Sequence, residues 1–178
     1  MRSSDLAIRR LVPDDAAAYR ALRLRGLKEH PDAFTSSHAE DSEMALSTTE
    51  QRLAPASRDW VFGAFVANGL FAVAGLSREP RAKNRHKASV FGMYVAPEHG
   101  RRGVGAALLR RVIEAAQSQP GLEQLVLTVT ETNVAARTLY EKFGFRSFGV
   151  EPRAIRVNDG VNDVYYDKNH MIHFLSLP

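Results

Sequence analysis

The sequence contains no cysteine among its 178 residues. This absence excludes disulfides, thiolate metal sites and a cysteine nucleophile. Long apolar runs are also missing, since no segment approaches the ~20 residues that cross a bilayer. The N-terminus lacks the apolar core of a signal peptide. We therefore expect a cytoplasmic protein without a membrane segment.

What the chain does contain is ordinary for a globular protein: 44% hydrophobic and 25% charged residues. We expect one domain covering residues 1–178. The net charge is +4 and the pI about 9.6, but the basic residues are scattered and form no long run. A small polyanionic ligand needs only one local cluster, so a basic nucleic-acid-binding domain is the weaker alternative.

One stretch of the sequence predicts a strand, a tight turn and a helix. The apolar run Ser89 to Val95 stops at Pro97, and a polar turn with glycines follows. Beyond the turn, apolar residues recur at helical spacing. The residues of this apolar face are Val104, Leu108, Val112 and Ala115.

The turn has the chemistry of a pyrophosphate site. The first N–H groups of a helix are unpaired and carry partial positive charge, so they bind phosphate. Gly103 and Gly105 let a ligand approach the backbone, and Arg101 and Arg102 add donors. An ordinary glycine-containing turn is the competing interpretation, because both the P-loop motif and the third glycine of the dinucleotide fingerprint are missing.

A second segment, NVAARTLYEKFGF from Asn133 to Phe145, follows the apolar run 125–129. The two segments together resemble the GNAT superfamily of acyl-CoA N-acyltransferases. That family carries V-x-P, then Q/R-x-x-G-x-G/A, and later N-x-x-A-x-x-L-Y-x-x-x-G-F. This sequence departs from the pattern at Gly100, where the family has Gln or Arg.

Hydrophobic periodicity and turn signals predict the remaining elements. Two hairpins are expected, at Asn68-Gly69 and at residues 158–160. Asn133 is expected to cap a helix that ends before Gly144. The predicted strands are 6–12, 60–67, 70–76, 87–95, 124–130, 146–156 and 161–175, and the predicted helices are 13–29, 40–53, 104 to before 120, and 134–143.

The order of elements implies an α/β (α+β mixed) fold with helices on both faces of a sheet. The resemblance implies a GNAT-like fold, with a central mixed, mostly antiparallel sheet splayed between the two motif strands. Acyl-CoA then lies in the opening. The backbone of Tyr94 and Val95 is expected to pair with its pantetheine arm. The other cofactor-binding residues that the resemblance implies are Arg101, Arg102, Gly103, Val104, Gly105, Ala106, Asn133 and Ala136.

Tyr140 is the candidate general acid, because the resemblance puts its hydroxyl near the thioester sulfur and a phenol is protonated at neutral pH. The competing interpretation is a helix-face residue with a hydrated hydroxyl. Glu131 is the best-placed carboxylate for a general base, because Ser89 stands where some GNAT enzymes have a glutamate. A solvated loop residue, with water deprotonating the amine, is the alternative for Glu131.

We predict an N-acetyltransferase that moves an acetyl group from acetyl-CoA to a primary amine, small or peptidic, by direct attack in a ternary complex. A catalytically silent acyl-CoA-binding module is the alternative. No metal is expected, since His170 and His173 would point to opposite faces of a strand. By analogy alone, His30, Phe34 and Tyr166 border the acceptor pocket. A homodimer is common in the family, and the acceptor carries no readable signature.

Overall fold

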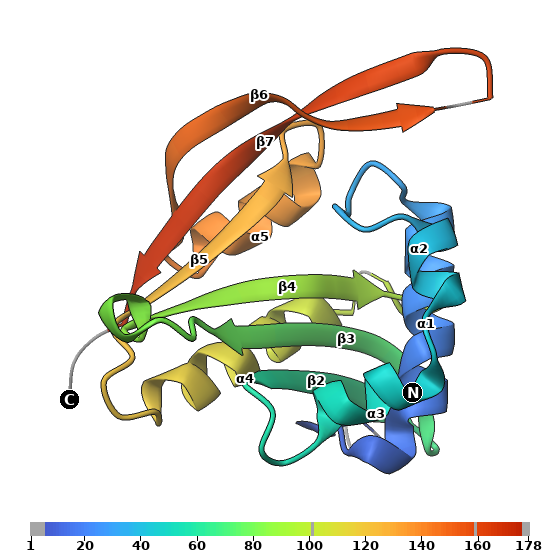
Figure 1. Ribbon diagram of the computed structural model, residues 1–178. Coiled ribbons are helices and arrows are strands. Elements are labelled where there is room, and N and C mark those ends of the chain that lie inside the picture. The colour runs from blue at the N-terminus through green and yellow to red at the C-terminus, as the bar shows by residue number, and fades with distance from the viewer. Residues whose placement is uncertain (1–5, 101, 159, 176–178) are drawn as a thin grey trace.

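The computed structural model describes residues 6–100, 102–158 and 160–175. The helix predicted over 40–53 is instead two short helices, because Met44 and Ala45 have extended backbone. The strands are β1 (Ala7–Arg10), β2 (Asp59–Val66), β3 (Gly69–Arg78), β4 (Lys87–Val95), β5 (Gln124–Thr130), β6 (Arg146–Asn158) and β7 (Asp163–Phe174), and the helices are α1 (Ala16–Glu29), α2 (His38–Glu43), α3 (Leu46–Leu53), α4 (Val104–Gln117) and α5 (Val134–Lys142) (Figure 1).

The described strands form one sheet in the order β1-β2-β3-β4-β5-β7-β6. All neighbours are antiparallel except β4 and β5, which run parallel. Their pairing is confined to residues 87–89 of β4 and 124–126 of β5, after which the strands diverge (Figure 1). The predicted fold class, a mixed and mostly antiparallel sheet that splays between the two motif strands, is confirmed.

A β-bulge in β4 lies where the sheet opens. Val73 of β3 faces Tyr94, whereas Gly75, two residues along, faces Phe91, so β4 holds one extra residue. Gly92 takes a φ of 61° there, which glycine adopts without strain. A bulge bends its strand and increases the local twist. The bulge lies just beyond Ser89, where the pairing of β4 with β5 ends.

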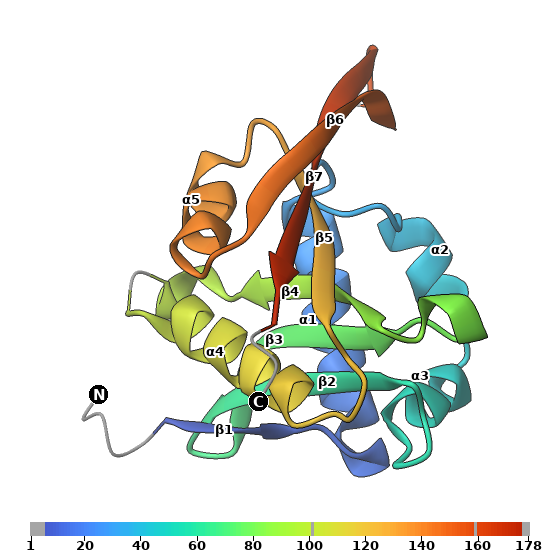
Figure 2. The same ribbon diagram turned by 90° about the vertical axis from the view of Figure 1, so that its left-hand side faces the viewer.

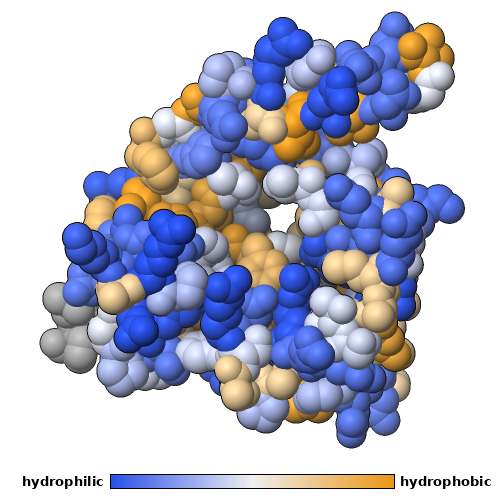
Figure 3. Space-filling view, in the orientation of Figure 1, coloured by the Kyte–Doolittle hydropathy of each residue, from blue (hydrophilic) through white to orange (hydrophobic). Residues whose placement is uncertain are grey.

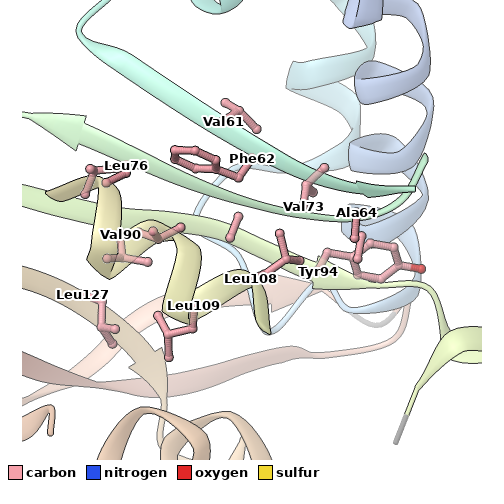
Figure 4. Close-up of a cluster of buried hydrophobic side chains, with 14 of the residues drawn as sticks. Val61, Phe62, Ala64, Val73, Leu76, Val90, Tyr94, Leu108, Leu109 and Leu127 are labelled. Atoms are coloured by element: carbon pink, nitrogen blue, oxygen red, sulfur yellow. The ribbon is translucent and has the colours of Figure 1, made fainter. Parts of the chain in front are cut away.

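Helices cover both faces of the larger part of the sheet (Figure 2). Helix α4 packs on β2, β3 and β4, while α1 and α3 lie on the opposite face. The predicted apolar face of α4 is buried, and it meets strand residues such as Val73, Val90 and Leu127 in the core (Figure 4). Among the described residues, no helix combines the length and apolarity that crossing a membrane requires.

The turn of the β2–β3 hairpin lies one residue earlier than predicted. Ala67 and Asn68 occupy its two central positions, with φ of 46° and 66°, and Gly69 already pairs with Val66. A register shift between Ala64 and Phe65 accompanies this placement. Asn68 tolerates positive φ well, whereas Ala67 does so at a cost that the strand pairing offsets.

Candidate active site

A cleft of about 650 Å³ lies where β4 and β5 diverge. The space-filling view shows the hollow between the two parts of the molecule (Figure 3). Its walls come from β4, the start of α4, α5 and the loop after α1. Eight of the residues predicted for the site line it: Tyr94, Val95, Gly103, Val104, Gly105, Asn133, Ala136 and Tyr140.

The N-terminus of α4 forms one end of this cleft. Gly103 is the N-cap residue, with a left-handed φ of 74°, and a Cβ built on it meets no atom within 4 Å. The first helical hydrogen bond runs from the Ala107 N–H to the Gly103 carbonyl. The N–H groups of Val104, Gly105 and Ala106 therefore have no partner within the helix. Together with the helix dipole they suit a phosphate group.

Gly105 has a packing role that the sequence analysis missed. A Cβ on Gly105 would lie 3.3 Å from the Cε of Met93 and 3.4 Å from a methyl carbon of Leu139. The glycine thus lets α4 approach β4 and α5 closely. Met93 itself lines the cleft, and no motif pointed to it.

Two predicted cofactor residues that the structure describes, Arg102 and Ala106, are not among those that line the cleft. Arg101 lies outside the described residues. Arg102 is exposed at the surface beside the turn. Ala106 belongs to the first turn of α4, so it can contribute its backbone N–H without lining the cleft.

Tyr94 and Val95 line the cleft at the free edge of β4. The pairing of β4 with β5 ends at Ser89, so beyond it the β5-facing edge of β4 has no strand partner among the described residues. The side chain of Tyr94 packs against Gly26, and its hydroxyl donates to the Glu29 Oε2 at 2.5 Å. Burial, together with this hydrogen bond, raises the pKa of Tyr94. The free backbone edge matches the predicted strand-like pairing with an amide-containing ligand.

Tyr140 is buried in the wall of the cleft, with 8% of its surface exposed. Its hydroxyl lies 3.5 Å from the Sδ of Met93, and its ring meets Phe145 edge-on at 5.9 Å. Burial raises the pKa of Tyr140 to about 12. The phenol is therefore protonated at neutral pH and can donate a proton to an anion that forms beside it.

Asn133 caps α5, as predicted. Its Oδ1 accepts a hydrogen bond from the Ala136 N–H at 3.1 Å. At the other end of α5, Gly144 takes the left-handed φ of 84° expected of a residue that ends a helix. The cap fixes the orientation in which α5 presents Tyr140 to the cleft.

Glu131 is not brought to the cleft. Its Oε1 accepts from the Nδ2 of Asn169 at 2.6 Å, and its Oε2 lies 3.3 Å from the Nη1 of Arg137. It is absent from the residues that line the cleft. Both carboxylate oxygens are engaged, so the geometry gives no support to the prediction that Glu131 is the general base.

The loop after α1 forms part of the wall of the cleft. His30 and Phe34, which were expected near the acceptor, line the cleft, whereas Tyr166 does not. The loop is tied to the far half of the sheet by two side chains. The Oγ1 of Thr130 and the Nζ of Lys168 donate to its backbone carbonyls, at 2.6 Å and 3.2 Å.

The two histidines of β7 lie in separate surroundings. The Nε2 of His170 is 3.1 Å from the Oε2 of Glu151, and the ring of His173 lies against Phe145. Within the described ranges, no group of three or more His, Asp or Glu side chains is arranged to hold a metal ion.

A sheet that opens beside a parallel strand pair, with a helix N-terminus and a buried tyrosine in the opening, defines the GNAT class of acyltransferase fold. The family comparison agrees: residues 24–145 match the model of the acetyltransferase (GNAT) family. The chain belongs to this family.

Sequence relatives that match part of the chain agree with this assignment. The chain is 34% identical over 77 residues to the ribosomal protein bS18-alanine N-acetyltransferase of Escherichia coli K12, covering 43% of this chain and 51% of the relative. It is 32% identical over 88 residues to an L-amino acid N-acetyltransferase of the same strain, covering 49% and 54%. The matches thus span about half the length of these curated relatives.

Solved structures match over almost the whole chain. An acetyltransferase of the GNAT family from Streptococcus pneumoniae superposes with a TM-score of 0.85 and 27% identity, covering 96% of this chain and 99% of that one. A putative acetyltransferase from Salmonella typhimurium, solved with its cofactor acetyl-CoA, gives a TM-score of 0.77 at 21% identity, covering 97% and 95%. The second likeness shows a shared fold.

Proposed function

We propose that the protein is an N-acetyltransferase that moves the acetyl group of acetyl-CoA to a primary amine by direct attack in a ternary complex. The observation that supports this most strongly is the convergence of two groups on one cleft. The free N–H groups at the start of α4 suit a pyrophosphate, and the protonated hydroxyl of Tyr140 suits a departing thiolate.

The cofactor is proposed to bind along the open edge of β4. The N–H groups of Val104, Gly105 and Ala106 hold the pyrophosphate, with help from Arg101 and Arg102 at the turn. The backbone of Tyr94 and Val95 pairs with the amide groups of the pantetheine arm. Asn133, at the N-cap of α5, and Ala136, in its first turn, line the opposite wall, and we propose that they contact the cofactor.

In the proposed reaction the amine nitrogen attacks the carbonyl carbon of the thioester. A C–N bond forms and the C–S bond breaks, so the sulfur leaves with the electron pair. Tyr140 gives its proton to the sulfur, while the proton lost by the amine passes to water. The tyrosinate then takes a proton from solvent, and the products are the N-acetylated amine and free coenzyme A.

The relatives agree with an amine acceptor. Those with curated names act, by those names, on the alanine of a ribosomal protein and on L-amino acids. Both names describe N-acetyltransferases. The matched segments cover about half of those relatives, so their names do not define the acceptor of this chain.

Two measurements test the proposal. Calorimetry at near-physiological ionic strength should detect acetyl-CoA binding, and free thiol should appear when an amine panel is added. Binding without thiol release across the panel would identify the silent acyl-CoA-binding module instead. Absence of any affinity for acetyl-CoA would exclude both.

A further inference from the structure

A second pocket, of about 400 Å³, adjoins the cleft on its acceptor side. The two cavities share wall residues, among them Phe34, Phe91, Gly92 and Thr128. The two cavities therefore adjoin along this wall, so a small molecule in one can contact residues that also line the other. The shared aromatic residues provide apolar contact for its carbon skeleton.

Most of the charged side chains that line the second pocket are positive. Among the described residues that line it, four are cationic and one, Asp59, is acidic. The cations come from α1, α3, the segment before β2, and β7, so the fold gathers them from distant parts of the sequence. They are Arg23, Arg52, Arg58 and Lys168.

Asp59 is shared between two of the arginines. Its Oδ2 lies 3.3 Å from the Nε of Arg52, and its Oδ1 lies 3.9 Å from the Nε of Arg58. The same Oδ1 also accepts from the Ser77 hydroxyl at 2.5 Å. One carboxylate cannot neutralise two guanidinium groups, so positive charge remains at this wall.

Arg23 stands at the junction of the two cavities. Its Nε is paired with Asp41, and its Nη2 lies 3.1 Å from the Ser36 hydroxyl. Its Nη1 would lie only 3.3 Å from a Cβ at Gly92, the bulge residue of β4. The guanidinium is thus held by its other two nitrogens, and Nη1 points at the wall that both cavities share.

Lys168 closes the pocket from β7. It is 4% exposed, and its Nζ donates to the Ala33 carbonyl at 3.2 Å. An ammonium group has three protons to donate, and the described residues supply this one acceptor. Burial lowers the pKa of Lys168, against the opposing effect of Asp32. An anion in the pocket would satisfy the remaining donors and favour the charged form.

We infer that the acceptor is a small amine that carries a carboxylate, as an amino acid does. The carboxylate faces the basic side chains Arg23, Arg52 and Lys168, and the amine, one carbon away in an α-amino acid, lies at the wall that the two cavities share. This inference rests on the proposed function. A peptide N-terminus is the contrasting acceptor, because its first residue presents an amide in place of the carboxylate.

Binding measured without turnover tests the inference independently of catalysis. Each of the common L-amino acids and its amide would be titrated by calorimetry into the protein saturated with coenzyme A. We expect at least one acid to bind about tenfold or more tightly than its amide. Equal or tighter binding of the amides, or no binding of any acid at millimolar concentration, would overturn the inference.

Variants test whether the preference for the acid comes from the basic pocket. Arg52→Gln should remove most of the preference for the acid over the amide while leaving acetyl-CoA affinity unchanged. Arg156→Gln is the matched control, because Arg156 forms a comparable 3.4 Å pair with Asp163 on the β6–β7 hairpin. An acid preference that survives in both Arg52→Gln and Lys168→Met would refute the basic pocket. Thiol release by the wild type tests the proposed function separately.

Discussion

Replacing Tyr140 with phenylalanine removes one oxygen atom from the proposed site. The ring keeps its edge-on contact with Phe145, and the hydroxyl's recorded partner is the sulfur of Met93 at 3.5 Å. A thioether is a weak acceptor. The variant should therefore lose less than about 1 kcal/mol of unfolding free energy. A large loss of activity in Tyr140→Phe could not then be attributed to misfolding.

The Tyr140→Phe substitution should instead lower the turnover number. General acid catalysis contributes about 10²–10⁴-fold to a rate, so we expect kcat of Tyr140→Phe to fall at least about 100-fold. Acetyl-CoA affinity should stay within about twofold, because the phosphate-binding amides belong to α4. Thiol release and calorimetry measure the two quantities. An unchanged kcat would remove Tyr140 from the mechanism.

The raised pKa of Tyr140 also gives a stability test. Its folded value of about 12 lies above its ordinary value of 10. Below pH 10 both states are protonated, and above it the unfolded chain loses the proton first, so stability falls as pH rises. At pH 11 this costs the wild type about 1 kcal/mol relative to Tyr140→Phe. Urea unfolding of both proteins at pH 8 and pH 11 should show the difference, and parallel curves would contradict the burial of the phenol.

The remaining predictions concern positions around the cleft. Gly103→Val should weaken acetyl-CoA binding about tenfold or more, because it strains a φ of 74° and covers the backbone amides. Gly160→Val, at a φ of 94° on the distant hairpin, should leave the binding unchanged. Equal Kd values for the two variants would show that the phosphate does not bind at Gly103. Glu131→Gln should lower kcat less than about threefold, since its carboxylate does not line the cleft, and a 100-fold loss would restore it as the base. Thr130→Val leaves the Asp32 carbonyl unpaired and should cost about 1–3 kcal/mol in urea unfolding; an unchanged midpoint would contradict that hydrogen bond.

The strand, turn and helices around the proposed cofactor site were predictable because their signals are local. Pro97 ends the strand before the turn, Asn133 caps the helix that follows the next strand, and Gly144 ends it. Each signal acts within a few residues of the backbone it shapes. The bounds of β4 and β5 were correct as well, since their apolar runs are flanked by polar residues or proline.

The proposed acceptor pocket was not predictable from the sequence, because distant segments form it. Lys168 meets a carbonyl of the loop after α1, 135 residues earlier in the sequence. Arg23 depends on Asp41, from the region where one long helix was expected and two short ones were found. Hydrophobic periodicity indicates single helices and strands and gives no information about contacts between distant segments. Met93 was missed for a related reason. It follows the bulge residue Gly92, and the extra residue of the bulge interrupts the alternation of side-chain directions along β4.

The bulge at Gly92 connects the two sides of the site. The bulge adds one residue to β4 beside its free edge, and the missing Cβ of Gly92 leaves room for the Nη1 of Arg23 at the shared wall. A side chain at this position would meet a left-handed φ and the guanidinium together. Gly92 thus lies both on the free edge of β4 and against the basic pocket. Residues of α1, α3 and β7 line the proposed acceptor pocket, whereas β4 and α4 line the proposed cofactor site.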